Sequence, residues 1–402
     1  MKKSAFKTIL LGYGLTLVAG CGCYHFRSSD YTYEVPKQLS DGINVSTLGI
    51  EKMDTSKIVE LTKLILADTF PNIHSLLIIR NNKLVYENYF AGSDYLPEKG
   101  KYNYMNHTID ELHDCRSISK SITGACIGLA VKQGFIKDID EPIFPYFPAY
   151  SKYFDSTKRK ITIRNLLTMT SGLEWDEKIS YSDSKNTEVQ MDRSQDPIDF
   201  ILSRPMVGEP GKEWNYNGGN PQLLEQILLK ATGIKLDKYA EQYLFAPLGI
   251  KKYEWMHMIN DMPAAAWGLR LRTRDLAKFG ILYMNDGVWN NNQVIDKDWV
   301  QQSIGSVVPR ISNQKNTNPG YGFMLWTYNI NKENIPAMVT EANGNGGQSI
   351  FMCKRFNLMV VFTGGNYNRT DFFHNYFEAI GNYVFAAIQC GPEKFSFPCP
   401  HS

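Results

Sequence analysis

The sequence of 402 residues lacks the marks of several protein classes. Neither sign of charge predominates, because 43 Lys and Arg face 41 Asp and Glu. A basic footprint for nucleic acid or for a polyanionic substrate is therefore missing, and we expect no nucleic-acid partner. The seven cysteines include no CxxC pair, and no His/Cys cluster has the spacing of zinc ligands. We accordingly expect neither a metal nor an organic cofactor.

Other signatures are missing as well. No internal repeat or low-complexity segment occurs. No Gly-x-Ser-x-Gly elbow is found, since Gly347-Gln348-Ser349-Ile350-Phe351 fails at its last position. The histidines are scattered along the chain, and each is interpreted as structural or exposed: His74, His107, His113, His257 and His374.

A long apolar run is also absent, and the apolar stretch Ile9–Val18 is too short to span a bilayer. It follows a basic start (Lys2, Lys3 and Lys7) and ends Leu17-Val18-Ala19-Gly20-Cys21, which resembles the bacterial lipobox. We predict a signal peptide over residues 1–20, lipidation of Cys21, and an exported lipoprotein anchored to a membrane of the bacterial cell envelope. An ordinary export signal, with Cys21 incidental, is the alternative.

Periodicity predicts strands near both ends and helices between them. The predicted elements are a helix over Thr55–Asp68, a hairpin of Ser75–Ile79 and Leu84–Tyr86 around Asn81-Asn82, helices over Ile163–Met169, Gln222–Thr232 and Arg274–Asn285 (N-cap Thr273), strands over Phe323–Tyr328, Ser349–Cys353 and Leu358–Thr363, and a helix over Asp371–Ile388. The simplest fold is α/β (α+β): one antiparallel sheet from both chain ends, flanked by helices.

The predicted domain organisation follows from this order. Residues 21–50 are interpreted as a tether with an irregular lead-in, residues 51–395 as one domain with a mostly helical insertion over about 135–290, and residues 396–402 as a tail. Cys390 and Cys399 could form a disulfide that closes a C-terminal loop.

The most informative feature is Ser117-Ile118-Ser119-Lys120, at the start of an apolar helical run that reaches Val131. Side chains three apart on a helix meet, so Ser117 and Lys120 can act as a nucleophile and its proton partner. The helix N-terminus favours a developing oxyanion and a depressed pKa of the lysine. By itself the pattern is weak, because Ser117 could simply cap a core helix, and because Ser4/Lys7, Ser182/Lys185 and Ser312/Lys315 share the spacing.

Further stretches agree with the first: Leu166–Leu173, Pro210–Leu224 with Tyr216, Gly268–Gly280, and Gly344–Gln348. Together they resemble the serine β-lactamase and penicillin-recognising superfamily, in the branch that holds class C β-lactamases, family VIII-type esterases and 6-aminohexanoate-dimer hydrolases. The resemblance covers roughly residues 55 to 390. It implies a β-lactamase/transpeptidase-like fold and a serine hydrolase that needs no cofactor.

The resemblance also implies roles for individual residues. Ser117 matches the acylated nucleophile, Lys120 its partner, and Tyr216 the tyrosine that completes the proton shuttle. Asn345-Gly346-Gly347 matches the third motif on the strand beside the nucleophile, which gives an oxyanion hole of the Ser117 and Gln348 N–H groups. Trp214 and Asn217 are further candidates for substrate contact.

Two departures from the family pattern narrow the substrate. Gly218 stands where the second motif commonly ends in asparagine, which removes an amide unless Asn217 or Asn220 replaces it. Asn345 stands in place of a lysine or histidine, so no fixed cation is predicted for the carboxylate of a β-lactam or a peptide C-terminus. Small esters or amides without that anion are therefore favoured. The alternatives are a D-amino-acid peptidase or β-lactamase, and a catalytically silent envelope protein that binds cell-wall peptide or a partner.

Overall fold

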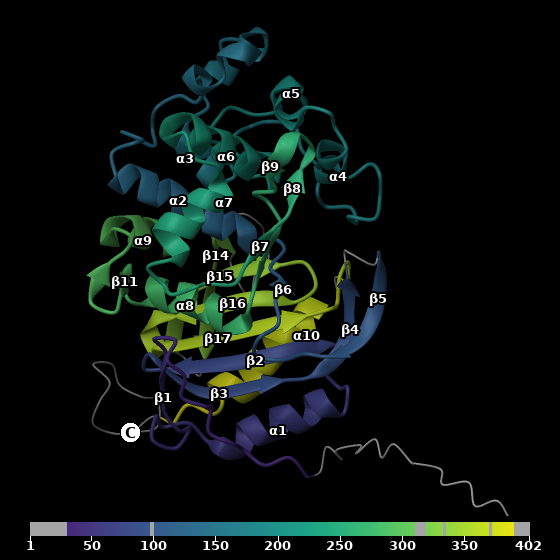
Figure 1. The fold of residues 1–402 in the computed structure, drawn as a ribbon, viewed down its shortest axis with the longest axis vertical. Coiled ribbons are helices and arrows are strands. Elements are labelled where there is room, and N and C mark those ends of the chain that lie inside the picture. The colour runs from purple at the N-terminus through teal and green to yellow at the C-terminus, as the bar shows by residue number, and fades with distance from the viewer. Residues whose placement is uncertain (1–29, 97–99, 310–318, 333–334, 370–371, 390–402) are drawn as a thin grey trace, which may run out of the picture.

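An eight-stranded sheet, built from both ends of the chain, forms the base of the molecule (Figure 1). The computed structural model describes residues 30–96, 100–309, 319–332, 335–369 and 372–389. The strand order is β1-β3-β2-β17-β16-β15-β14-β13. The bounds are β1 Asn44–Val45, β2 Ile73–Arg80, β3 Lys83–Tyr89, β13 Gly320–Tyr321, β14 Trp326–Lys332, β15 Ile335–Gly344, β16 Gln348–Cys353 and β17 Leu358–Gly364.

The two chain ends meet at the centre of this sheet, where β2 pairs with β17 in antiparallel register and Ile78 lies opposite Val360. Every residue of β2, β16 and β17 is buried. The strands therefore form nearly continuous apolar runs, as expected where helices cover both faces of a sheet. The predicted fold class is confirmed.

Helices close both faces of the sheet. On one face, α1 (Thr55–Leu66) lies against a π-helical turn, η9 (Ile380–Phe385), which continues α10 (Phe372–Ala379). On the other face, α8 (Thr273–Met284) packs on β2, β16 and β17, and α2 (Ile118–Lys132) packs on β15. Helix α2, which begins directly after Ser117, is thus held between the sheet and the helices above it (Figure 1).

The remaining elements are short. The helices are α3 Ile163–Leu167, α4 Thr187–Asp192, α5 Pro197–Ser203, α6 Gly219–Thr232, α7 Leu236–Ala240 with the π-turn η6 Glu241–Phe245, α9 Lys297–Ile304, and the 3₁₀ turns η3 Phe144–Tyr146, η4 Pro148–Tyr153, η5 Lys158–Lys160, η7 Ile259–Asp261 and η8 Lys354–Phe356. The small sheets pair β4 Ala91–Leu96 with β5 Lys101–Asn106, β10 Leu269–Leu271 with β6 His113–Asp114 and β7 Glu254–Trp255, β8 His257–Met258 with β9 Met262–Pro263, and β11 Val288–Trp289 with β12 Asn292–Gln293.

Several predicted elements lie where the sequence put them. The hairpin turns at Asn81 and Asn82, whose φ values of 52° and 62° suit asparagine in a two-residue turn. Some boundaries differ from the prediction, and for two of them the structure shows the reason. The helix predicted after an N-cap at Thr273 begins at Thr273 itself, because the Thr273 hydroxyl lies 2.9 Å from the Ser75 hydroxyl instead of capping the helix. The strand predicted from Phe323 begins at Trp326, since Met324 has a φ of 57° that breaks an extended strand.

The N-terminal part of the chain is described from residue 30. Tyr33 donates a hydrogen bond to the Val85 carbonyl at 2.8 Å, and Ile43 and Leu48 are buried. Cys21, Cys390 and Cys399 lie outside the described residues, so the lipid anchor and the disulfide stay predictions. None of the helices in the described part of the chain has the length and apolar character needed to cross a membrane.

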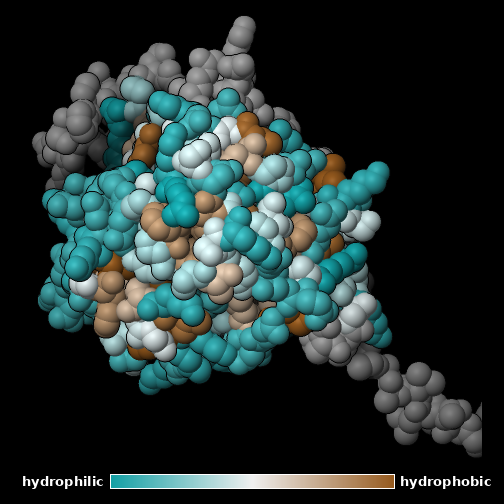
Figure 2. Space-filling model, turned by 90° about the horizontal axis from the view of Figure 1, so that it is seen from above, coloured by the Kyte–Doolittle hydropathy of each residue, from teal (hydrophilic) through white to brown (hydrophobic). Residues whose placement is uncertain are grey.

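Seen from above, over the helices, the surface is mostly hydrophilic, with apolar side chains in small scattered groups (Figure 2). The 43 basic and 41 acidic residues of the chain contribute to this hydrophilic surface. The apolar mass lies instead between the layers, where α2 supplies a row of fully buried residues from Ile118 to Cys126.

The packing of α9 against α2 depends on Gly128. A Cβ at this position would lie 2.4 Å from the Trp299 indole, whereas one on Gly381, in η9, would meet nothing within 4 Å. We expect Gly128→Ala to lower the free energy of unfolding by about 1–3 kcal/mol through overpacking. Urea denaturation followed by circular dichroism measures this. Gly381→Ala is the control and should change stability little. Equal stability of the two variants would contradict the contact.

Candidate active site

Ser117 lies immediately before α2, at the N-terminal end of a helix that is buried from Ile118 through Ala130. A helix that is apolar on every side is typical of a protein core. The Ser117 side chain makes no capping hydrogen bond to this helix. The interpretation of Ser117 as a simple helix cap therefore finds no support in the geometry, and its hydroxyl is available for other contacts.

Lys120, one turn into α2, has its ammonium group surrounded by three acceptors. Its Nζ lies 3.2 Å from Ser117 Oγ, 3.3 Å from Glu188 Oε2 and 3.1 Å from the Ala266 carbonyl oxygen, and the residue is 1% exposed. A lysine ammonium has three protons, so each has an acceptor. Ser117 and Lys120 are thus brought together as predicted.

The electrostatics of Lys120 differ from the prediction. Burial, the largest single effect, acts to lower its pKa, but the charge of Glu188, followed by those of Tyr216 and Glu177, together outweighs burial, and the pKa is raised. The expectation of a depressed pKa was wrong because no local pattern in the sequence indicates that a carboxylate approaches Lys120. Lys120 is therefore an ammonium at neutral pH, and in that form it cannot accept a proton from Ser117.

Glu188 occupies the space that the second motif leaves open. It lies in the first turn of α4, where Asn186 Oδ1 accepts hydrogen bonds from the Glu188 and Val189 N–H groups at 3.0 and 3.4 Å. A Cβ on Gly218 would lie 1.8 Å from Glu188 Oε2. Any side chain at position 218 would collide with the Glu188 carboxylate. Glycine at this position therefore allows a carboxylate, instead of an asparagine amide, to face Lys120.

A second carboxyl group, that of Glu177, lies in the same cluster. It accepts hydrogen bonds from the Tyr181 hydroxyl at 2.9 Å and from the Gly218 N–H. Burial, together with the neighbouring Glu188 carboxylate, raises the pKa of Glu177 to about 8. Near neutral pH, Glu177 is therefore mostly protonated. One ammonium then faces one carboxylate, which avoids an uncompensated buried charge.

Tyr216 lies beside Lys120, whose Nζ is 5.0 Å from the centre of the tyrosine ring. Burial raises the pKa of Tyr216, while Lys120 and a hydrogen bond with Ser117 act to lower it. Its ring stacks on Trp326 at 5.6 Å, and Trp214 packs edge-on against Trp326 at 5.4 Å. These aromatic rings form the apolar wall of a cavity of about 430 Å³ that Ser117 also lines.

The third motif forms the tight turn from β15 to β16. Gly346 and Gly347 have φ values of 101° and 96°, a region that favours glycine. The Asn345 amide is held from both sides by Asn368: Asn345 Nδ2 donates to Asn368 Oδ1 at 3.0 Å, and Asn345 Oδ1 accepts from the Asn368 N–H at 2.7 Å. Asn345 therefore faces the cavity as a neutral group that already has partners.

The other predicted site residues are placed as follows. Gln348 begins β16, and its side chain anchors the turn by donating to the Gly364 carbonyl at 2.7 Å. The roles of the Ser117 and Gln348 N–H groups in an oxyanion hole stay predictions. Asn217 is 1% exposed, and its Oδ1 accepts from the Gly219 N–H at 2.8 Å at the start of α6. The structure thus places Asn217 beneath Tyr216 and not among the residues that line the cavity.

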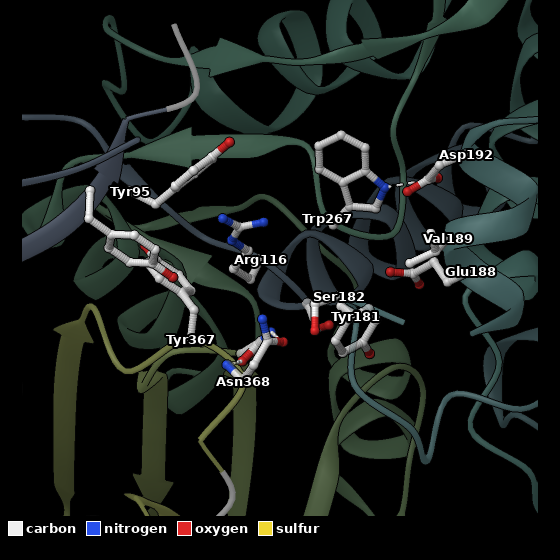
Figure 3. Close-up of a pocket in the computed structure, with 13 residues that line it drawn as sticks. Tyr95, Arg116, Tyr181, Ser182, Glu188, Val189, Asp192, Trp267, Tyr367 and Asn368 are labelled. Carbon is white, nitrogen blue, oxygen red and sulfur yellow. Dashed lines mark hydrogen bonds between the residues drawn. The ribbon is translucent and has the colours of Figure 1, made fainter. Parts of the chain in front are cut away.

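Ser117 also lines a second cavity, of about 390 Å³, and Figure 3 shows the side chains around it. Arg116 points into it and is paired with Asp114 at 3.0 Å, while its guanidinium lies 4.7 Å above the centre of the Tyr367 ring. Trp267 Nε1 donates to Asp192 Oδ1 at 3.2 Å on the opposite wall. The lining residues are Tyr95, Tyr102, Arg116, Ser117, Tyr181, Ser182, Glu188, Val189, Asp192, Trp267, Asn345, Tyr367 and Asn368.

Sequence reasoning missed several of these residues, above all Glu188. It lies 68 positions from Lys120, in a segment with no motif of its own. The single available signal was indirect: Gly218, where an asparagine is common, implied that some other group takes the place of the missing side chain.

The fold and the site together define the class. The chain matches the beta-lactamase family model over residues 74–380, and it belongs to that family, whose members are serine hydrolases. A 6-aminohexanoate-dimer hydrolase of Paenarthrobacter ureafaciens is 24% identical over 308 residues, which cover 71% of each chain. The resemblance stated from the motifs is confirmed.

Solved structures show the same fold. A Bacillus anthracis protein named as a candidate 6-aminohexanoate-dimer hydrolase aligns with a TM-score of 0.65 at 17% identity, over 90% of each chain. A hydrolase with promiscuous acyltransferase activity aligns with a TM-score of 0.63 at 14% identity, over 82% of this chain and 98% of that one. At these identities the likeness shows the fold alone.

The position of Glu188 can be tested through Gly218. In Gly218→Ala, the new methyl group must displace the Glu188 carboxylate, so we expect labelling of Ser117 by a fluorophosphonate to slow about 100-fold, the effect of a small misplacement in a catalytic cluster. Gly208→Ala is the matched control, because a Cβ there would come no closer than 3.6 Å to Glu213 Oε2. Equal labelling of Gly218→Ala and the control would contradict the arrangement.

Proposed function

We propose that this protein cleaves an ester or amide through an acyl-enzyme on Ser117, with Lys120 and Tyr216 as the proton shuttle. The observation that carries the proposal is the distance of 3.2 Å between Lys120 Nζ and Ser117 Oγ, at a point where two cavities meet. A serine hydroxyl is a weak nucleophile until a neighbouring group accepts its proton. Lys120 and Tyr216 are the groups placed to do so.

Glu188 completes this shuttle as the final proton acceptor. Because Lys120 is an ammonium at rest, it releases one proton to Glu188 Oε2, at 3.3 Å, as it takes the proton of Ser117. The ammonium charge is thus kept while Ser117 Oγ forms a bond to the substrate carbonyl carbon. The proton then returns through Lys120 and Tyr216 to the leaving group, and water cleaves the acyl-enzyme and restores the Ser117 hydroxyl.

The developing negative charge on the carbonyl oxygen needs donors. The N–H groups of Ser117 and Gln348 are the ones we assign, and each such donor typically contributes about 3 kcal/mol to the transition state. Support comes from the approach of β15 to the nucleophile: a Cβ on Gly344 would lie 3.1 Å from the Ser117 nitrogen and 2.5 Å from the Cys115 carbonyl oxygen. The strand edge therefore borders the reacting carbonyl.

The cavity walls favour a substrate without a carboxylate next to the scissile bond. Asn345 is neutral, Arg116 is already paired with Asp114, and Glu188 and Asp192 line the wall across from Arg116 (Figure 3). Burial, followed by the charge of Glu188, raises the pKa of Asp192 to about 7, so this wall gains negative charge as the pH rises through neutrality. A small neutral ester or amide fits these walls better than a β-lactam.

The acyl-enzyme is tested on the chain from residue 24 to 402. We expect one fluorophosphonate adduct per chain by intact mass, with turnover of nitrophenyl acetate well above that of nitrocefin. Ser117→Ala should lose the adduct and the turnover, because among the described residues Ser117 is the one serine whose hydroxyl lies within hydrogen-bonding distance of Lys120. Ser182→Ala is the control, since Ser182 shares the Ser-x-x-Lys spacing and lines the cavity. A folded wild type that takes no label and turns over neither substrate would favour the silent binding protein, and faster nitrocefin turnover the β-lactamase.

Glu188→Gln separates the relay from a lysine that acts alone. The change removes the largest of the neighbouring charges that raise the pKa of Lys120, so that pKa should fall and neutral lysine should become more abundant. If Glu188 takes the proton, ester turnover at pH 7 should fall about 100-fold. If Lys120 alone is the base, the variant should instead become faster near neutral pH, which would contradict the relay. Glu209→Gln, an exposed glutamate paired with Lys160, is the control. Rates measured from pH 5 to 9 distinguish the two results.

A further inference from the structure

A second buried polar cluster is formed by four residues that precede Ser117 in the chain, the last of them His113. His74 on β2, Asp94 on β4, His107 just after β5, and His113 on β6 come together although they are spread over 40 positions. Their exposed fractions are 0, 4, 7 and 4%. The proposed reaction uses none of them. A group of buried imidazoles around a carboxylate is costly unless every polar atom has a partner.

The four side chains offer one donor atom each, and these atoms all lie within 4.8 Å of one another. His74 Nδ1 lies 2.8 Å from His113 Nε2, and His113 Nε2 lies 3.7 Å from Asp94 Oδ2. A tetrahedral zinc ion with bonds of 2.0 to 2.1 Å holds its donor atoms about 3.3 Å apart. The observed separations fall on both sides of this value, so small rotations of the side chains form the site without moving the backbone.

The candidate ligands make further hydrogen bonds of the kind that metal ligands make to the residues around a metal site. His113 Nδ1 donates to the Asp114 carbonyl at 3.1 Å, which leaves the His113 Nε2 lone pair directed at the cluster. His74 Nε2 lies 3.4 Å from Asn72 Oδ1, and Asp94 Oδ1 accepts from the Tyr367 hydroxyl at 2.8 Å. Metal-binding histidines and carboxylates characteristically have such outer partners, which fix the tautomer and the ring orientation.

His107 supplies the observation that a hydrogen-bonded network does not explain. Its Nε2 is buried and has no hydrogen-bond partner among the described residues, while its ring stacks on that of His74 at 3.8 Å. His107 thus brings to the cluster a buried ring nitrogen that no hydrogen bond among the described residues uses, and a metal ligand needs such a free nitrogen.

We propose that His74, Asp94, His107 and His113 bind one zinc ion. Three imidazoles and one carboxylate are a donor set that suits zinc, and four protein ligands leave no open position, so the role is structural. The ion would join β2, the β4–β5 hairpin and β6, and so fix the segment that leads to Ser117. It would also hold one wall of the cavity, because Tyr95 follows Asp94 in the chain and Tyr367 donates to it (Figure 3).

The prediction of no metal from the sequence rested on spacing along the chain, and the proposal replaces it. His107 and His113 are separated by five residues, a spacing that zinc motifs use, but His74 and Asp94 lie far from them in the chain. The ligands meet because three short strands converge, which spacing does not reveal.

The experiment uses the chain from residue 24 to 402, purified without chelator. Zinc is measured by inductively coupled plasma mass spectrometry, and the melting temperature is measured before chelation, after chelation and after zinc is restored. We expect about one zinc per chain, a lower melting temperature after removal, and recovery on addition. Cobalt(II) added to the stripped protein should give the visible absorption of a tetrahedral site, which reports on the ligands independently of stability.

Two ligand variants and one control complete the test. His107→Asn and Asp94→Asn should each lose zinc and the cobalt absorption, and their melting temperatures should match that of the stripped wild type. His257→Gln, a histidine outside the cluster, should keep both, as should Ser117→Ala. Zinc-free wild type whose melting temperature does not respond to zinc would overturn the proposal. So would ligand variants that retain zinc at the wild-type level.

Discussion

The ammonium group of Lys120 is the constraint on which the arrangement of the site depends. An uncompensated charge of this kind, 1% exposed, would destabilise the fold by several kcal/mol. Its three acceptors come from three separate segments: Ser117 from the turn before α2, Glu188 from α4, and the Ala266 carbonyl from the segment before β10. The helical region above the sheet is therefore tied to the nucleophile through one nitrogen atom.

The same constraint accounts for the unusual second motif. A carboxylate approaches Lys120 where related sequences commonly carry an amide, and it does so through space that a glycine leaves empty. A charged partner in place of a neutral one acts to raise the pKa of the lysine, and in the proposed reaction Lys120 therefore passes a proton on instead of only accepting one. The protonated Glu177 beside it keeps the cluster near neutrality. Gly218, Glu188 and Glu177 thus depend on one another: the glycine leaves room for the Glu188 carboxylate, and Glu177 accepts a hydrogen bond from the Gly218 N–H.

The sequence predicts the parts of this molecule that depend on local pattern. The hairpin at Asn81-Asn82, the buried helix after Ser117 and the strands over residues 349–353 and 358–363 follow from periodicity and turn residues. Long β15 was missed because Pro336 and alternating polar residues conceal it, and the β4–β5 hairpin because its strands are mostly polar. Glu188 and the histidine cluster were missed because their partners are remote in the chain, and nothing in a local pattern fixes which remote segments meet.

One stretch of the resemblance acquires a physical meaning from the structure. The segment leading into β10 runs beside the nucleophile segment and pairs with it at successive positions: the Cys115 N–H donates to the Leu269 carbonyl, the Leu269 N–H to Ser119 Oγ, and Lys120 to the Ala266 carbonyl. Gly268 permits this course, because a Cβ there would lie 2.7 Å from the Ala264 Cβ.

A shift of this pairing by one residue would move His113 and Lys120 together, since both are fixed to the same strand. The register that places His113 opposite Leu271 is therefore also the register that sets Lys120 against the Ala266 carbonyl. His113 and Lys120 stand at the two ends of an eight-residue segment, and each belongs to a buried polar cluster. A shifted pairing register that one cluster could accommodate would still break the contacts of the other. Apolar packing alone could not do this, because neighbouring apolar side chains of similar size can replace one another at little cost.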